Sequence, residues 1–460
     1  MSKREYSRRE FLKQNSLAGV GTLLATGIAS SLFANTTKNA STPAILGGKP
    51  KIEGSWPKWP MWNPETDEKL VVETLRSGVW SRKKVVDEFE KKWAATVGTA
   101  RCLTVVNGTN ALIASLIQLG IGAGDEVIIP PYTFIATAQA VLATGAIPIF
   151  VDTDPETFQM DATKIEAKIT SRTTAIMPVH LAGAPADMAH IMAIAKQHSL
   201  VVVEDACQAH LAEFNHQKVG TIGHAGCFSF QNSKNLPIGE GGAIVSNDEA
   251  FMDRCYSYHN LGNPYGSLIG SVEVGSTINA TKLRLTEYQA AIGLAQLVRL
   301  DGQAKTRTEN AEYLASKLKQ IPGILPMKMY PDATRVAYHL FPFRYKKEEF
   351  KGLSRNSFIS ALNAEGIPCY SGYDPLNKMP FLNDAFKSKN FVKTYSKKRL
   401  NYANYLAQNN CPQNDILCNE EAVWFSQNLL LAGKSEMDGI FSAMEKIRTN
   451  ADKIEKASDK

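Results

Sequence analysis

The chain has 460 residues, of which 44% are hydrophobic and 21% are charged. Such a composition is typical of a globular protein, and the length suffices for two or three domains with a sizeable core. The net charge of +6 is small for this size and the charges are interspersed, so the sequence indicates no nucleic-acid-binding surface. The seven cysteines are odd in number and form no CxxC pair, which argues against a disulfide framework or a bound metal.

The N-terminal segment, residues 1–34, differs in kind from the rest of the chain. Its run Ser7-Arg8-Arg9-Glu10-Phe11-Leu12-Lys13 precedes a weakly apolar stretch, residues 17–33, and resembles a twin-arginine export signal. The resemblance implies passage through the twin-arginine translocase and an exported, periplasmic protein. A membrane tether formed by an uncleaved signal stays open, because no clear cleavage site follows. The alternative is a basic amphipathic helix.

Residues 35–64 are polar and contain several glycines and prolines, so they are predicted to form an irregular lead-in. Trp56, Trp59 and Trp62 are expected to fix this lead-in onto the body by burying their rings.

Residues 65–310 are predicted to form a large domain in which helices and short apolar strands alternate. Helices are expected at 67–76, 85–96, 111–119, 135–144, 163–169, 188–197 and 285–300, and strands at 102–106, 126–130, 147–151, 174–179, 200–204, 227–230 and 243–246. Strands without polar alternation, separated by helices, indicate a parallel sheet covered on both faces. The predicted fold class is therefore α/β, with a mostly parallel, doubly wound sheet.

Residues 311–450 are predicted to form a smaller C-terminal α+β domain. It contains an extended segment at 338–345 and helices at 357–365 and 436–450. Residues 451–460 are predicted to be a polar tail.

Polar residues follow several of the predicted strands, where ligands bind in open α/β sheets. Asn107-Gly108-Thr109-Asn110 opens a helix, and the free N–H groups there favour an anion such as phosphate. A plain turn with a helix N-cap explains the same run equally well. Asp205 ends the strand at 200–204, with Gln208 three residues later. A carboxylate there could hold a pyridine nitrogen protonated, or it could simply cap the next segment.

Lys234 lies just beyond a buried apolar strand and before the turn Gly239-Glu240-Gly241-Gly242-Ala243. That position suits a lysine that forms a Schiff base, because burial keeps its amine neutral. A lone lysine in such a place is otherwise usually a surface residue.

Together, Asp205-x-x-Gln208, Ser229-x4-Lys234 and the Gly-Glu-Gly-Gly-Ala turn closely resemble the DegT–StrS family of sugar aminotransferases, which depend on pyridoxal 5′-phosphate (PLP). The resemblance runs from about residue 46 to about residue 447. Within the family the chain is most similar to the branch of amino-cyclitol aminotransferases and 3-amino-5-hydroxybenzoate synthases. That branch is indicated by Gly47-Gly48-Lys49-Pro50, Trp56-Pro57-Lys58-Trp59-Pro60, Ser77-Gly78-Val79-Trp80 and Glu421-Ala422-Val423-Trp424.

The resemblance implies a fold type I transferase and a role for each matching residue. Lys234 corresponds to the lysine that holds PLP as a Schiff base, Asp205 to the partner of the pyridine nitrogen, and Gln208 to the partner of the ring oxygen. The residues implied to bind the phosphate or to cover the ring are Gly108, Thr109, Asn110, Ser229 and Phe134. The resemblance also implies a homodimer whose active sites are shared between subunits.

One position departs from the family pattern. The family usually has Asn-x-Arg-x-Thr-Glu, and that Asn reaches the phosphate held by the partner subunit. This chain has Lys282-Leu283-Arg284-Leu285-Thr286-Glu287. Lys282 could serve the phosphate as a point charge, or Asn279 could substitute for the missing Asn.

The predicted activity is transfer of an amino group from an amino acid, glutamate or glutamine, to a keto-sugar or keto-cyclitol. A PLP-dependent sugar dehydratase of the same family is one alternative, although dehydratases usually carry His in place of the cofactor lysine. An exported PLP- or sugar-binding relative without catalysis is the other. His180 and His210 also lie near strand ends, and we expect both to be core or supporting residues.

Overall fold

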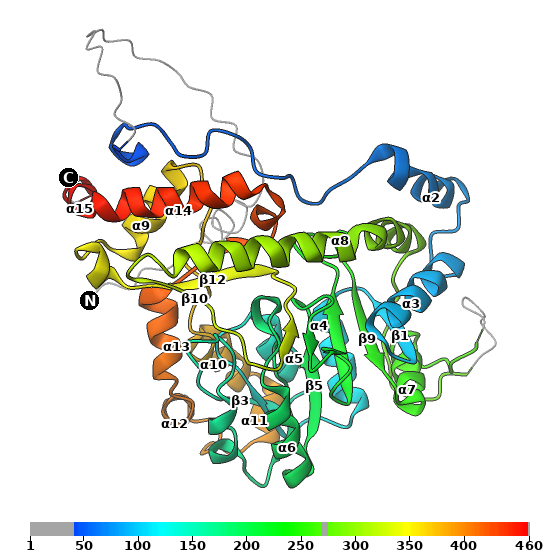
Figure 1. The fold of residues 1–460 in the computed structure, drawn as a ribbon. Helices are drawn as coiled ribbons and strands as arrows, with labels where there is room; N and C mark the ends of the chain where they lie inside the picture. The colour runs from blue at the N-terminus through cyan, green and yellow to red at the C-terminus, as the bar shows by residue number, and fades with distance from the viewer. Residues whose placement is uncertain (1–40, 268–274, 459–460) are drawn as a thin grey trace, which may run out of the picture. The chain divides into compact units, whose positions relative to one another are not determined.

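The computed structural model describes residues 41–267 and 275–458 (Figure 1). The predicted export signal lies outside the described residues. No helix in the described ranges is both long and apolar enough to cross a membrane.

The large sheet has seven strands in the order β1-β9-β8-β5-β4-β2-β3. Their bounds, in that order, are Arg101–Val105, Gly242–Ser246, Ala225–Ser229, Val201–Asp205, Thr173–Ile176, Glu126–Ile129 and Ile147–Phe150. β9 runs antiparallel to its neighbours β1 and β8, whereas the other pairings are parallel. The predicted mostly parallel α/β sheet is therefore confirmed.

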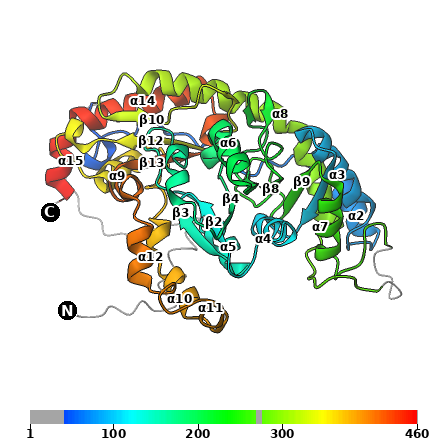
Figure 2. The same ribbon diagram turned by 90° about the horizontal axis from the view of Figure 1, so that it is seen from below.

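Helices cover both faces of this sheet. They are α2 (Pro64–Arg76), α3 (Lys84–Val97), α4 (Gly108–Gln118), α5 (Ala136–Ala143), α6 (Met188–His198), α7 (Glu249–His259) and α8 (Glu287–Leu318). The crossover through α5 runs toward one edge of the sheet and that through α6 toward the other, so right-handed connections place them on opposite faces. Figure 2 shows α4 and α5 on one side of the strands and α6 on the other.

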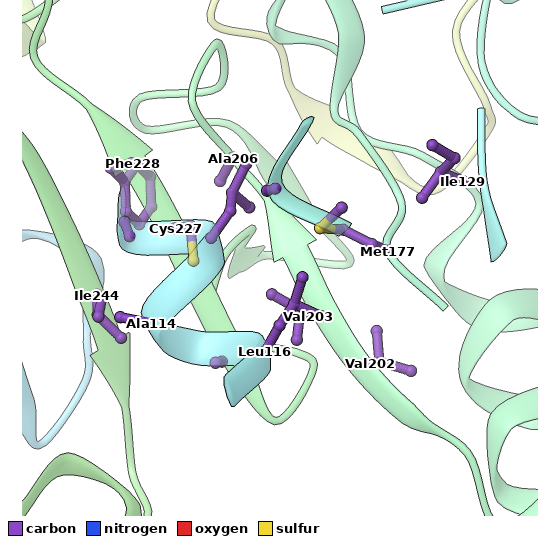
Figure 3. Close-up of a cluster of buried hydrophobic side chains, with 14 of the residues drawn as sticks. Ala114, Leu116, Ile129, Met177, Val202, Val203, Ala206, Cys227, Phe228 and Ile244 are labelled. Atoms are coloured by element: carbon purple, nitrogen blue, oxygen red, sulfur yellow. The ribbon is translucent and has the colours of Figure 1, made fainter. Parts of the chain in front are cut away.

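The main core lies between the sheet and these helices. Figure 3 shows Ala114 and Leu116 of α4 beside Val203, Cys227 and Ile244 of the strands. All five side chains are buried, which explains why the strand sequences are apolar throughout rather than alternating.

A second core surrounds a three-stranded antiparallel sheet of order β10-β12-β13. Its elements are β10 (Ile324–Pro326), β12 (Leu340–Tyr345), β13 (Ala422–Ser426), α9 (Arg355–Ala364), α14 (Lys434–Thr449) and α15 (Ala451–Ser458). A third small sheet joins β11 (Ala333–Arg335), β6 (Glu213–Phe214) and β7 (Gln217–Lys218). The smaller α+β part was predicted, and β12, α9 and α14 fall close to their predicted positions.

Several elements differ from those expected from the sequence. Helix α8 has 32 residues and continues through the boundary placed at residue 310. Its first part packs in the main core through Leu300 and Ala304, and its last part in the second core through Leu314 and Leu318. No proline interrupts it, and residues such as Ala304 favour helix throughout.

The segment from 376 to 411 is also placed differently from the prediction. Its helices α10 (Pro380–Lys387), α11 (Lys389–Thr394) and α12 (Tyr402–Gln408) pack on the main core through Leu382, Phe386 and Tyr405, rather than on the second core. A short helix α13 (Pro412–Ile416) leads back to β13.

The predicted polar tail is instead mostly helical. α15 begins at Ala451, and Ala451 and Ile454 are both buried in the second core, so these apolar residues hold the end of the chain against the body. The helix predicted at 163–169 consists of two short 3-10 turns, Ala162–Lys164 and Glu166–Lys168. The side chain of Asp161 accepts the backbone N–H of Thr163 and begins the first turn.

In the lead-in, Trp56 packs against the second core and donates to the carbonyl of Gly366 at 2.7 Å. Trp59 lies against the guanidinium of Arg307, which is 5.0 Å from the ring centre. Trp62 is 42% exposed, so the predicted burial is wrong for this residue.

Candidate active site

The predicted cofactor residues converge at the carboxyl edge of the large sheet. A Cβ atom on Gly108 would lie 2.8 Å from Sγ of Cys207 and 2.8 Å from Cβ of Ser229. The first turn of α4 therefore rests directly on the residues that end β5 and β8. Only glycine allows this approach, and it brings Gly108, Ser229 and the end of β5 together.

The start of α4 has a capping residue, and it also has backbone N–H groups that could bind an anion. The side chain of Asn107 caps the helix by accepting the backbone N–H of Asn110 at 2.9 Å, and it also accepts from the Asn110 amide at 2.9 Å. The N–H groups of Gly108 and Thr109 have no acceptor within the helix, because they belong to its first turn. They remain available for an anion.

Asp205 is a buried carboxylate held by neutral donors. Its Oδ2 accepts from the hydroxyl of Thr137 at 2.8 Å, and its Oδ1 accepts from the backbone N–H of Cys207 at 3.3 Å. The side chain is 5% exposed. Among the residues that the structure describes, no lysine, arginine or histidine forms an ion pair with Asp205. A buried carboxylate outside any ion pair is suited to a positively charged group of a bound ligand.

Phe134 lies close to Asp205 in the turn that follows β2. Its carbonyl accepts the backbone N–H of Thr137, the residue that donates to Asp205. Its ring is 55% exposed, unlike the buried Tyr132 and Thr133 before it. An accessible aromatic ring on the turn that carries Thr137 suits a residue that stacks on a flat ligand.

Gln208 joins the large sheet to the smaller part of the molecule. Its Oε1 accepts from the backbone N–H of Ala182 at 2.8 Å, and its Nε2 donates to the hydroxyl of Tyr373 at 3.0 Å. Tyr373 precedes the helices that return to the main core, and no local motif in the sequence indicated that it would reach Gln208.

Lys234 lies in the same region with an amine that is poorly solvated. Burial lowers the pKa of Lys234, and the nearby Cys207 and Asp205 oppose that shift only in part. No carboxylate in the described residues forms an ion pair with its Nζ. The contact that Nζ makes is with Nε2 of His339, at 3.5 Å. A lysine in these surroundings reaches the neutral, nucleophilic form more readily than an exposed one.

The two histidines expected to be core residues are buried. His180 lies 2.9 Å from Glu204, whose carboxylate also accepts backbone N–H groups of Gly220, Ile222 and Gly223. His210 packs among Trp93, Phe228 and Phe230, with ring centres 5.7 to 5.9 Å away. Both positions confirm a supporting role in the fold.

The structure does not bring Lys282 to these residues. Its side chain is exposed, and its backbone forms an isolated bridge with Asn260. Its predicted role at a partner's site, like the catalytic and cofactor-binding roles of the residues above, stays a prediction.

The residues fit PLP. A buried carboxylate outside any ion pair suits the protonated pyridine nitrogen, a half-buried amine outside any ion pair suits the aldehyde, and the first turn of α4 suits the phosphate. In the described ranges, no three His, Cys, Asp or Glu side chains gather as they would around a metal ion.

Comparison with known proteins agrees with this chemistry. Residues 63–401 match the DegT/DnrJ/EryC1/StrS aminotransferase family. A putative L-glutamine:3-amino-2,3-dideoxy-scyllo-inosose aminotransferase from Micromonospora echinospora is 33% identical over 423 residues, covering 90% of this chain and 99% of the relative. The spore coat polysaccharide biosynthesis protein SpsC of Bacillus subtilis (strain 168) is 37% identical over 358 residues, covering 75% of this chain and 91% of the relative.

Among solved structures, 3-amino-5-hydroxybenzoic acid synthase matches with a TM-score of 0.75 and 30% identity, covering 85% of this chain and 98% of that one. The likeness therefore extends over most of this chain and nearly all of that one. The chain belongs to the DegT/DnrJ/EryC1/StrS aminotransferase family, and it is a PLP-dependent aminotransferase of fold type I.

Proposed function

We propose that this enzyme moves an amino group from glutamine or glutamate to the ketone of a cyclitol. The observation that carries the chemistry is the pairing of a buried, uncompensated carboxylate, Asp205, with a poorly solvated amine, Lys234. Support for a cyclitol comes from relatives named as glutamine:inosose aminotransferases, which align over nearly their whole length.

Each residue has a task that its surroundings allow. When bound, PLP supplies an electron sink that makes the α-proton of the donor acidic. Asp205 holds the proton on the pyridine nitrogen. Lys234 Nζ would serve as the base that takes the donor's α-proton and holds it for return. The N–H groups of Gly108 and Thr109 and the hydroxyl of Ser229 bind the phosphate.

Asn110, Phe134 and Gln208 orient or cover the groups at this site. Asn110 is held by the cap residue Asn107, so it orients the first turn of α4. Phe134 covers the ring, and Gln208 meets the ring oxygen from a position fixed by its bonds to Ala182 and Tyr373.

A donor and acceptor panel tests the proposal. With purified, PLP-loaded enzyme, glutamine or glutamate alone should bleach the cofactor absorbance, and scyllo-inosose or 2-deoxy-scyllo-inosose should then restore it as the aminated product forms. If a nucleotide-linked keto-sugar restores the absorbance and neither inosose does, the acceptor is a sugar rather than a cyclitol. A deoxygenated product without transferred nitrogen would indicate the dehydratase, and no bleaching with any donor would indicate a binding protein.

The active unit is proposed to be a homodimer with shared sites. The support is the family resemblance, together with the exposed position of Lys282 away from this chain's own cofactor residues. An isologous two-fold interface is the commonest arrangement of soluble oligomers.

The enzyme is also proposed to be exported after folding. The support is the run around Arg8 and Arg9, together with a cofactor that is made inside the cell and held only by a folded site. Changing Arg8→Lys and Arg9→Lys together should retain the protein in the cytoplasm with PLP bound, as measured by fractionation and cofactor content. Unmodified protein with an intact N-terminus in the cytoplasm would contradict export and leave the aminotransferase chemistry intact.

A further inference from the structure

His339 is a buried histidine from the smaller part of the molecule that reaches Lys234. It immediately precedes β12, is 7% exposed, and places Nε2 3.5 Å from Nζ of Lys234. This separation is at the long limit for a hydrogen bond, as is common for catalytic contacts before substrate binds. No motif in the sequence linked the two residues, which are 105 positions apart.

The neighbouring Asn235 fixes which nitrogen of His339 carries the hydrogen. The Nδ2 of Asn235 donates to the carbonyl of Ala337 at 2.8 Å, so the amide must turn its Oδ1 toward His339. That oxygen lies 3.3 Å from Nδ1 of His339. An amide oxygen only accepts, so Nδ1 carries the hydrogen and Nε2 presents its lone pair to Lys234.

The backbone before His339 is held in an unfavourable conformation. Tyr338 has φ of 48°, in the left-handed region that residues with a side chain rarely adopt. The backbone N–H of Ala337 donates to the carbonyl of Gly183 at 2.8 Å, which ties this turn to the loop that also contacts Gln208. Strain of this kind is kept where the surrounding structure fixes it, typically at functional sites.

We propose that His339 is a positioning residue that orients the amine of Lys234 by accepting one of its N–H bonds at Nε2. The inference rests on the proposed role of Lys234 as the residue that moves the α-proton. With one N–H directed at Nε2, the lone pair of the neutral amine is free to face the donor's α-carbon.

This geometry determines where the proton from the donor's α-carbon goes. Nζ takes the α-proton, and the electron pair of the broken C–H bond stays with the organic fragment. The resulting ammonium keeps one hydrogen on Nε2 while it delivers another to the carbon that completes the transfer. His339 takes no proton itself, because burial and the charges of Lys234 and Arg307 hold the pKa of His339 well below its ordinary range.

The proposal predicts a change in Lys234 that can be measured without cofactor or substrate. An ammonium donates a stronger hydrogen bond than an amine, so Nε2 favours the protonated form of Lys234. His339→Phe should lower the pKa of Lys234 in the apoprotein by about one unit, whereas His339→Gln, which offers an amide oxygen, should restore most of the difference. Competitive acetylation across pH, followed by peptide mass spectrometry, measures this pKa.

A kinetic readout accompanies the labelling. In the PLP-loaded enzyme, His339→Phe should slow the half-reaction with glutamine by roughly 10- to 100-fold, with little change in the donor KM. The isotope effect with α-deuterated glutamine should rise, because proton transfer becomes more rate-limiting. His339→Gln should recover most of the rate.

Phe341→Leu is the matched control, since Phe341 lies in β12 two residues after His339, is buried, and stacks on Phe425 of the neighbouring strand. It should lower thermal stability and leave the pKa of Lys234 and the isotope effect unchanged. The proposal is overturned if His339→Phe leaves both unchanged, or if Phe341→Leu shifts both as much. Failure of the cyclitol panel would not affect the labelling result, so the two proposals fail separately.

Discussion

At the scale of single residues, the site is defined by charges that the chain leaves uncompensated. Asp205 is buried and accepts from a hydroxyl and a backbone N–H, and burial lowers the pKa of Lys234 more than the nearby Asp205 raises it. A protein that merely needed stability would pair or remove such groups. Their persistence next to each other is what an electron-sink cofactor with a protonated nitrogen and an aldehyde requires.

Asp205→Asn should preserve shape and remove the charge. The amide can still accept from Thr137, but it can no longer hold a proton on the pyridine nitrogen. We expect the half-reaction with glutamine to fall by about 10²-fold or more. Single-turnover absorbance measures this rate. Thr137→Val, which removes one donor and keeps the charge, should have a smaller effect, and an Asp205→Asn enzyme near the wild-type rate would contradict the assignment.

The burial of His210 predicts that the protein loses stability as the pH falls. Burial lowers the pKa of His210 to about 3, reinforced by Lys234 and Arg307 and opposed by a backbone contact with Ser229. The unfolded chain takes up a proton below about pH 6.5, whereas the folded chain does not until about pH 3. Between about pH 6.5 and pH 3, each unit of decreasing pH therefore lowers the free energy of unfolding by up to about 1.4 kcal/mol. Above about pH 6.5 this contribution of His210 to stability is fully present.

His210→Phe should therefore shift acid unfolding to lower pH, because a phenyl ring fits among Trp93, Phe228 and Phe230 and binds no proton. Denaturant unfolding between pH 3 and 8 measures the effect. His259, whose pKa burial also lowers to about 3, still titrates in the variant, so some acid sensitivity should remain. An unchanged pH dependence would show that His210 does not contribute.

At the scale of elements, the close approach of α4 to the strand ends sets the phosphate site. Gly108→Ala introduces a Cβ 2.8 Å from both Cys207 Sγ and Ser229 Cβ, so the first turn must move away from its position. We expect PLP to bind at least about 10-fold more weakly, which is roughly 1.4 kcal/mol. Equilibrium titration of apoprotein with PLP measures the change.

Gly302→Ala is the control for this substitution. Gly302 lies within α8, and nothing lies within 4 Å of the Cβ it would gain. Alanine there should leave PLP binding unchanged and stabilise the helix by up to about 1 kcal/mol. Equal loss of PLP binding in both variants would contradict the argument from Gly108.

The elements also show what a sequence can and cannot predict. The strands predicted at 200–204 and 227–230 lie within one or two residues of the observed β5 and β8, because a run such as Val201–Asp205 is apolar until its two final carboxylates. The end of α8 and the docking of Phe386 were not, since helical periodicity does not say which core a helix face meets. His339 and Tyr373 join the site through contacts across more than a hundred residues, which no local pattern encodes.

At the scale of the whole molecule, the proposed homodimer makes a prediction about Lys282. If Lys282 serves the partner's phosphate, Lys282→Glu homodimers should retain PLP poorly. Mixed with Lys234→Ala protein under exchanging conditions, they should form heterodimers in which one site has both residues intact. A 1:1 mixture should then recover about a quarter of wild-type sites, counted by borohydride-fixed cofactor on Lys234.

Recovery in this mixture would be absent if Lys282 acted within its own chain, and if Lys282 did not act at all the Lys282→Glu homodimer would already retain PLP. A Lys282→Arg homodimer, which keeps the charge, provides the matched control and should retain PLP nearly as well as wild type. Monomeric protein with full activity in sedimentation would contradict the dimer itself.

The continuous helix α8 limits how such a protein can be divided. Leu300 and Leu314, fourteen residues apart on one rigid rod, belong to different cores. A crossover between two related genes at residue 310 would join two half-helices whose apolar faces fit different packing partners. A chain cut there would expose Leu314 and Leu318 to water. The part that carries His339 and the part that carries Lys234 are therefore expected to fold as one unit, and an exchange between related proteins should succeed only where the crossover lies outside α8.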